Sequence, residues 1–216
     1  MAMTGKTRVV AGVTVIDTPI VARAMDLARA HSEPFLFNHA VRSWLFAVRL
    51  GQLQDIPDDP EVVAVGSLLH DLGLTDSFTG PRRFEIEGAD AARAFAREEG
   101  LDDRRAQLVW DTVALNSTPS IALHKETEVA LSTAGIGLDF AGAQHDRIPP
   151  DEMRKILEDY PRLDMKRQFT ASVCSILRTK PETTHDNFAR DFGERFVPGY
   201  KPQSSVDWLV NAPFEE

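Results

Sequence analysis

The chain has 216 residues, 43% of them hydrophobic and 26% charged, which is typical of a globular protein with a substantial core and excludes disordered or collagen-like chains. Its formal net charge is −9 and no segment supplies a basic face, so we expect neither nucleic acid nor a membrane as a partner. A single cysteine, no secretory signal and no apolar run near the roughly 20 residues of a membrane span together predict a cytoplasmic protein.

Caps, prolines and apolar spacing predict helices along most of the chain. Thr18 followed by Pro19 is typical of a helix start, and this first helix is expected to run to about Ala30. Further helices are expected over ranges that share apolar spacing of three and four, or a preceding cap residue: Phe35–Leu50, Glu61–Asp71, Arg83–Glu99, Asp102–Asn116, His124–Phe140, and about 151–159, 164–178, 182–196 and 205–211. Only Arg8–Ile16 fits a short strand.

These elements predict an all-α fold, a single-domain helical bundle of about nine or ten helices. The predicted domain covers residues 19–200, with an N-terminal extension at residues 1–18 and a C-terminal tail at residues 201–216. The prolines near Ile148–Pro150 indicate a weaker boundary inside it.

Three histidines are followed directly by aspartate. His145-Asp146 and His185-Asp186 lie in polar segments that are typical of solvated loops and helix starts. His70-Asp71 instead ends the apolar segment Val62–Leu69, where an imidazole and a carboxylate need partners. A divalent cation would satisfy both at once, most easily where the helix ends, as Gly73 implies. The alternative is a capped helix end with His70 hydrogen-bonded to a carbonyl.

Two more candidate ligands lie on other predicted helices. His39 lies in the middle of an aromatic helix, and Asp139 lies between two apolar residues, where an unpaired acid is costly. Gly135 precedes Asp139 by one turn and leaves room for an ion or another backbone. Arg42 follows His39 by one turn, and we expect it to pair with Asp71 or another acid.

The order along the chain of His39, the His70-Asp71 pair and Asp139 resembles that of the ligands in the HD-domain superfamily of metal-dependent hydrolases. The flanking segments are similar to its cyanamide hydratase-like branch, over about residues 20–200: Phe37–Arg42, Leu68–Thr75, Arg83–Ala92 and Phe188–Gly199. The resemblance implies an HD-type bundle in which one divalent ion, zinc in cyanamide hydratase, is held by His39, His70, Asp71 and Asp139. The same donors suit Fe²⁺ or Mn²⁺. Four protein ligands complete a tetrahedral shell, so chemistry then requires a fifth or sixth position.

The resemblance further implies a metal-dependent hydratase or hydrolase that adds water to a small-molecule substrate such as cyanamide or a related nitrile. The first alternative is a phosphohydrolase acting on a nucleotide, which is disfavoured because no lysine follows Asp71 to neutralise a polyanion. The second alternative is a non-enzymatic protein with a structural ion. A homodimer is a further expectation.

Five residues are candidates for the chemistry around the ion. Asp71 would accept the proton of water, Asn116 would orient the substrate and His124 would pass a proton to the product nitrogen. Asn38 and Thr75 would donate hydrogen bonds into the pocket. The structural alternative for Asn116 is a buried amide that ties off a helix end, and for His124 it is a surface histidine. For Asn38 and Thr75 the alternative is local backbone capping. A second metal ion would need further ligands between the His70-Asp71 pair and Asp139, where the chain offers Asn116 and His124. Asparagine is a poor metal ligand, so Asn116 favours a site with one ion over a site with two.

Overall fold

The computed structural model describes residues 5–214, which begin with a β-hairpin. Strands β1 (Thr7–Val10) and β2 (Val13–Ile16) pair antiparallel, with Thr7 opposite Ile16. The sequence predicted one strand over this range. The structure contains two strands because the residues between them, Ala11 and Gly12, have positive φ angles of 48° and 85°, the backbone of a two-residue hairpin turn.

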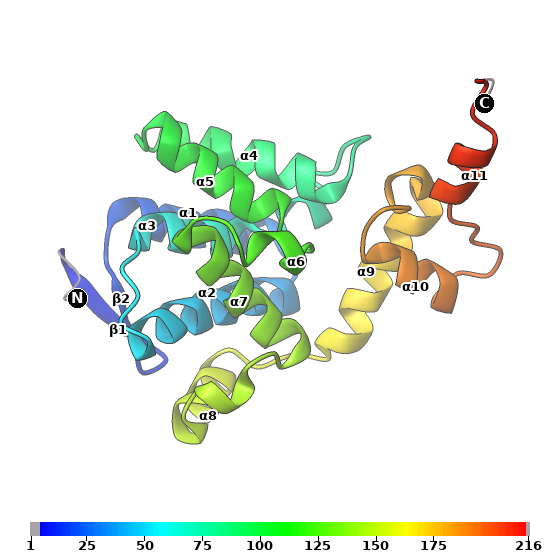
Figure 1. The fold of residues 1–216 in the computed structure, drawn as a ribbon. Helices are drawn as coiled ribbons and strands as arrows, with labels where there is room; N and C mark the ends of the chain where they lie inside the picture. The colour runs from blue at the N-terminus through cyan, green and yellow to red at the C-terminus, as the bar shows by residue number, and fades with distance from the viewer. Residues whose placement is uncertain (1–4, 215–216) are drawn as a thin grey trace. The chain divides into compact units, whose positions relative to one another are not determined.

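The remainder of the described chain is helical, which confirms the predicted all-α class (Figure 1). Three short 3₁₀ turns, η1 (Leu72–Leu74), η2 (His145–Arg147) and η3 (Pro181–Thr183), accompany the α-helices. The α-helices among residues 5–214 are α1 (Pro19–His31), α2 (Pro34–Leu53), α3 (Pro60–Leu69), α4 (Phe84–Glu98), α5 (Asp103–Ala114), α6 (Pro119–Ala122), α7 (Thr127–Ala141), α8 (Pro150–Asp159), α9 (Met165–Thr179), α10 (Ala189–Phe196) and α11 (Ser205–Val210). None of them combines the length and apolarity needed to cross a bilayer.

Two helix starts differ from the sequence prediction. The helix expected from His124 begins at Thr127, because Pro119 initiates the separate four-residue helix α6 and the chain turns before it can continue. The helix expected over 182–196 is divided into η3 and α10. Each shift involves a proline that carries no backbone N–H and therefore favours the first turn of a new helix.

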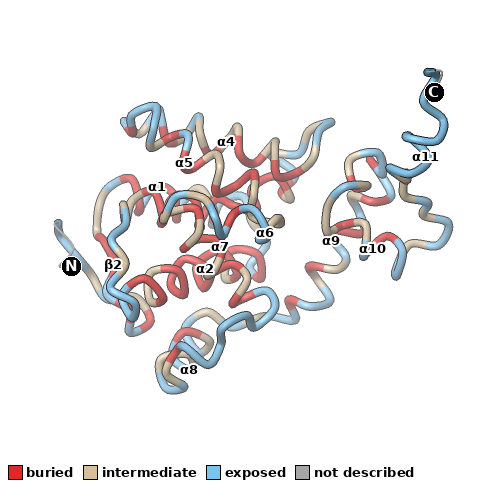
Figure 2. The backbone as a smooth tube through the Cα atoms, in the orientation of Figure 1, coloured by how far each residue is buried: buried red, intermediate tan, exposed pale blue. Residues whose placement is uncertain are grey.

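The chain forms two compact units, one running through Met165 and the other beginning at Lys166. In the second unit, α9 and α10 enclose a small core, and the rings of Phe169 and Phe188 lie 6.4 Å apart. Its buried apolar residues are Phe169, Val173, Cys174, Leu177 and Ala189. The apolar side chains of α11 are exposed, and Figure 2 shows that helix in pale blue.

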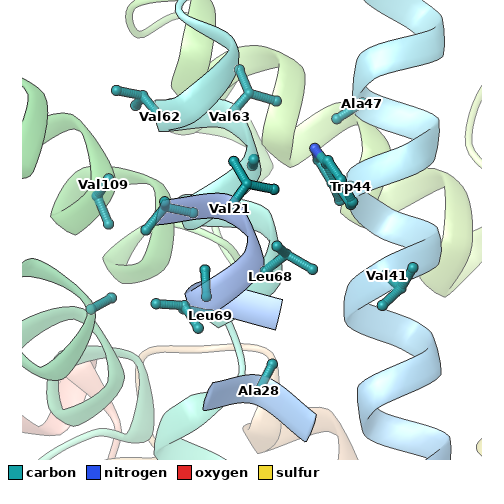
Figure 3. Packing of buried hydrophobic residues seen from close by; sticks show 14 of the residues in the cluster. Val21, Ala28, Val41, Trp44, Ala47, Val62, Val63, Leu68, Leu69 and Val109 are labelled. Carbon is teal, nitrogen blue, oxygen red and sulfur yellow. The ribbon is translucent and has the colours of Figure 1, made fainter. Parts of the chain in front are cut away.

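The core of the first unit is centred on α2 and α3, whose residues are mostly buried, and Figure 2 shows α2 largely in red. α2 packs against α7 and α3, while α3 also contacts α1, α5 and α7. Figure 3 shows how side chains from four of these helices meet, with Trp44 of α2 facing Val21 of α1 and Leu68 of α3. Because α3 is buried on every side, a polar residue at its end must find partners inside the protein.

Two glycines allow backbones to approach closely around this core. A Cβ atom at Gly135 of α7 would overlap the backbone of α2 at Ser43 and Ala47. A Cβ atom at Gly73 would overlap the Phe84 carbonyl at the start of α4. The sequence left open whether Gly135 makes room for an ion or for another backbone, and the structure shows that it makes room for α2.

Candidate metal centre

His39, His70 and Asp71 reach one point from the middle of one helix and the end of another. His39 lies within α2, whereas α3 ends at Leu69 and His70 is its last residue with helical angles (φ −61°, ψ −27°). Asp71 then departs from the helix (φ −106°, ψ 12°). Neighbours on a continuing helix point about 100° apart, and this change of direction instead lets His70 and Asp71 face the same point. The predicted helix end is therefore confirmed.

The three ligand atoms are spaced as a single small cation requires. The Nε2 atoms of His39 and His70 are 3.2 Å apart, and Asp71 Oδ2 lies 3.2 Å from His70 Nε2 and 3.6 Å from His39 Nε2. A point equidistant from all three lies about 1.9 Å from each, slightly less than the roughly 2.0–2.2 Å bonds of zinc to imidazole and carboxylate. Within residues 5–214 this is the one group of three or more possible ligands with such spacing.

Hydrogen bonds on the far sides of both rings show which nitrogens face the cluster. His70 Nδ1 donates to the Ser67 carbonyl at 2.8 Å, and His39 Nδ1 donates to Asp139 Oδ2 at 2.6 Å. In a neutral imidazole, the other nitrogen then carries a lone pair. Asp71 Oδ2 is buried and receives no hydrogen bond from the described residues. Three acceptors thus face one another in a buried space, an arrangement that fits a divalent ion.

The buried charges of the cluster shift one another's pKa values. Burial by itself lowers the pKa of the His70 imidazole, but the Asp71 carboxylate, together with the Ser67 carbonyl and the Asp139 carboxylate, raises the pKa of His70 above its ordinary value. Burial conversely raises the pKa of the Asp71 carboxyl, and the nearby His70 and His39 imidazoles lower the pKa of Asp71 below its ordinary value.

Asp139 lies behind His39 and is not part of this group. Its Oδ2 accepts the His39 Nδ1 hydrogen, and Arg42 donates to both of its oxygens, from Nε at 2.6 Å and from Nη2 at 2.8 Å. Arg162 Nη1 also donates to Oδ1 at 3.3 Å. Burial raises the pKa of this carboxyl, but the bonds from His39 and Arg42 hold the pKa of Asp139 well below its usual range. The acid that the sequence expected beside Arg42 is therefore Asp139.

The comparison with known families matches the part of the chain that contains the candidate ligands. The HD-domain model matches residues 36–165, more than half of the chain, and this range contains His39, the His70-Asp71 pair and Asp139. The chain belongs to the HD-domain family. HD domains are generally metal-dependent hydrolases that bind divalent ions. A comparison with curated proteins finds no match, and the cyanamide hydratase-like branch stays a prediction.

Three of the other predicted site residues of this HD domain donate side-chain hydrogen bonds to backbone carbonyls. Asn116 Nδ2 donates to the carbonyls of His70 at 3.2 Å and Val113 at 2.8 Å, so it ties the end of α5 to the metal-binding turn. Thr75 Oγ1 donates to the Leu72 carbonyl at 2.7 Å within η1. Asn38 Nδ2 donates to the Pro161 carbonyl at 2.8 Å. His124 follows α6 and is exposed. Their catalytic roles stay predictions.

Sequence reasoning did not anticipate a buried carboxylate on the helix that packs against η1. Glu85 of α4 is fully buried, and its Oε1 accepts from Ser117 Oγ at 2.7 Å and from Arg83 Nη2 at 2.8 Å. It lies within the motif Arg83–Ala92, but a single acid in an amphipathic helix is usually exposed. Only the tertiary contacts of α4, including the hydrogen bond from Ser117, show that this acid is buried.

Proposed function

We propose that this HD domain is a metal-dependent hydratase or hydrolase that adds water to a small electrophilic carbon, with cyanamide or a related nitrile as substrate. The observation that carries the proposal is the cluster of three buried acceptors, His39 Nε2, His70 Nε2 and Asp71 Oδ2, whose mutual separations are 3.2–3.6 Å. A divalent ion held by these atoms would lower the pKa of water and polarise the substrate.

The exposed side of the cluster is the side of Asp71. The accessible fraction of Asp71 is 5%, against 1% for each of the two histidines, so we infer that water and substrate approach from the side of this carboxylate. The Asp71 carboxyl has a pKa below its ordinary value and is therefore ionised near neutral pH. It is placed to accept the proton that the attacking water loses. The proton then passes to the nitrile nitrogen to give isourea, and transfer of the remaining hydroxyl proton to nitrogen gives urea, so that cyanamide plus water balances as urea.

The charges around the cluster favour a compact neutral substrate over a phosphoester. The guanidinium groups of Arg42 and Arg162 bind Asp139, and the Arg83 guanidinium binds Glu85. The turn after the HD pair, Leu72–Thr75, contains no lysine. A polyanionic substrate needs cations that are free to neutralise it during transfer. These arginines already neutralise the buried acids of the protein.

Two measurements on one preparation test the proposal. The protein is loaded separately with Zn²⁺, Fe²⁺ and Mn²⁺, its metal content is measured, and urea formation from cyanamide is followed. We expect one bound ion per chain and urea formation that is lost in H39A and in D71N. The matched control is D103N, which removes a carboxylate that is 88% exposed on its side chain.

Each outcome decides between the candidate functions. Urea formation by H39A at the wild-type rate would refute the metal-dependent mechanism. Phosphate release from a panel of nucleotides, with no urea from cyanamide, would replace the proposal with a phosphohydrolase. A bound ion with neither activity would replace it with a protein in which the ion is structural.

A further inference from the structure

The carboxylate of Asp139 has its acceptor positions filled by side chains. Oδ1 accepts from Arg42 Nε at 2.6 Å and from Arg162 Nη1 at 3.3 Å, while Oδ2 accepts from His39 Nδ1 at 2.6 Å and from Arg42 Nη2 at 2.8 Å. An ionised carboxylate offers about four lone-pair positions in all. Asp139, which is 3% exposed, therefore has no lone pair left to offer to a metal ion.

The His39 ring separates Asp139 from the three clustered atoms. Asp139 binds Nδ1 of that ring, whereas Nε2 faces His70 and Asp71. The two nitrogens of an imidazole point to different sides of the ring, and the partner of one determines which of them carries the proton. By accepting the Nδ1 hydrogen, Asp139 leaves the Nε2 lone pair directed at the cluster.

Arg42 in turn holds Asp139 in place. It is fully buried in α2, and it makes two hydrogen bonds to the carboxylate. Its Nη1 also donates to the carbonyls of Tyr160 at 2.9 Å and Pro161 at 3.2 Å, where the chain leaves α8. Asn38 and Arg162 add further bonds between this segment and the bundle. A carboxylate fixed from four directions cannot turn toward an ion without breaking these bonds.

We infer that Asp139 is a positioning residue for His39 and that this metal centre has three protein ligands, His39, His70 and Asp71. The inference rests on the proposed metal-dependent function, which it deepens. The sequence resemblance implied a fourth ligand that would complete a tetrahedral shell. With three protein ligands, a tetrahedral ion keeps a position for water or substrate and needs no expansion of its shell. An acceptor behind a ligating histidine also raises its basicity and fixes its ring.

Cobalt substitution separates a positioning role from ligation. Co²⁺ is bound to the apo-protein, its visible absorption spectrum is recorded, and its affinity is measured by titration for the wild type, D139N, D71N and the exposed control D103N. We expect D139N to bind Co²⁺ about 10–100-fold more weakly with an unchanged spectrum at saturation. D71N is expected to change the spectrum, and D103N to change neither quantity. A changed spectrum in folded D139N would overturn the inference.

A measurement on the wild type covers the case in which D139N does not fold. Long-range ¹H–¹⁵N spectra of the histidine side chains are recorded before and after Zn²⁺ is added. We expect the Nε2 resonances of His39 and His70 to shift, while His39 Nδ1 keeps a protected hydrogen bonded to Asp139. Loss of that hydrogen on zinc binding would overturn the inference. Failure of the wild type to bind either ion would refute the proposed function itself, which is a different result from either outcome above.

Discussion

Replacing Gly135 by alanine tests whether the spacing of α2 and α7 depends on the absence of a side chain. The added Cβ would lie 2.6 Å from the Ala47 nitrogen and 2.8 Å from the Ala47 Cβ, and it would also overlap the Ser43 carbonyl. Two of these three atoms are backbone and cannot rotate away. Ser43 and Ala47 follow His39 on α2 by one and two turns, so separating α2 from α7 displaces a metal ligand.

The same helix provides a matched control. A Cβ at Gly137 would meet only the Ala143 Cβ, at 3.9 Å, which is ordinary contact. Both replacements remove the entropic cost of glycine in a helix, about 0.5–1 kcal/mol. G137A is therefore expected to stabilise the protein by that amount. G135A is expected to gain the same entropic stabilisation, but its added Cβ overpacks the interface between α2 and α7. Overpacking costs about 1–3 kcal/mol, and we expect the upper end of this range because backbone atoms must move.

The two variants are compared by urea unfolding and by thermal unfolding followed with circular dichroism. We expect the free energy of unfolding of G137A to exceed that of G135A by about 3 kcal/mol, which corresponds to a Tm difference of roughly 6–12 °C for a chain of this size. We also expect G135A, and not G137A, to bind Zn²⁺ more weakly than the wild type. Equal unfolding midpoints for the two variants would refute the close approach of α2 and α7 at Gly135.

Three further predictions concern the ion, acid titration and two site candidates. Zn²⁺ at about 100 times its Kd should stabilise the apo-protein by about 2.7 kcal/mol, and a chelator should reverse the gain; no change in Tm would contradict binding to the folded state. The hydrogen bond from Trp110, and after it the contacts with Arg82, lower the pKa of Asp90 below its ordinary value of 3.8. The ionised Asp90 carboxylate therefore stabilises the fold above pH 3.8, and this stabilisation is lost as the pH falls through the lowered pKa. Trp110 fluorescence, measured with the other tryptophans replaced by phenylalanine, should change below pH 3.8, and a change centred above it would refute this assignment. N116A should lose about 1–3 kcal/mol, because the His70 carbonyl loses a donor, whereas H124A should be neutral for stability, and urea unfolding of both checks this.

Local sequence signals were sufficient for most of the helices and for the key pair of the site. Apolar spacing and caps are short-range properties, so the ranges of α2, α3 and α4 follow from them closely. The stop at Gly73 indicated that His70 and Asp71 lie where a helix ends, and the backbone angles confirm it. Errors occurred where a proline begins a new turn, as at Pro119, because periodicity continues across such a break.

Side-chain partners far apart in the chain could not be obtained in this way. The sequence indicated an acid for Arg42 but not which one, since the two residues that meet are separated by 97 positions. It likewise gave no sign that Arg162 binds Asp139, or that Glu85 is buried beneath Ser117. Such pairs depend on how whole helices pack, and a charged residue on a helix face looks the same in the sequence whether it is buried or exposed.

The helical fold, the HD family and three candidate ligands on two helices are thus determined by local patterns and by the order of a few polar residues in apolar segments. The part played by Asp139 was decided by tertiary structure alone. A carboxylate between apolar neighbours must have partners, but whether those partners are an ion or an arginine and a histidine depends on which side of the His39 ring it occupies. That position is set by the contact of α2 with α7 at Gly135, a distance between helices that no stretch of sequence encodes on its own.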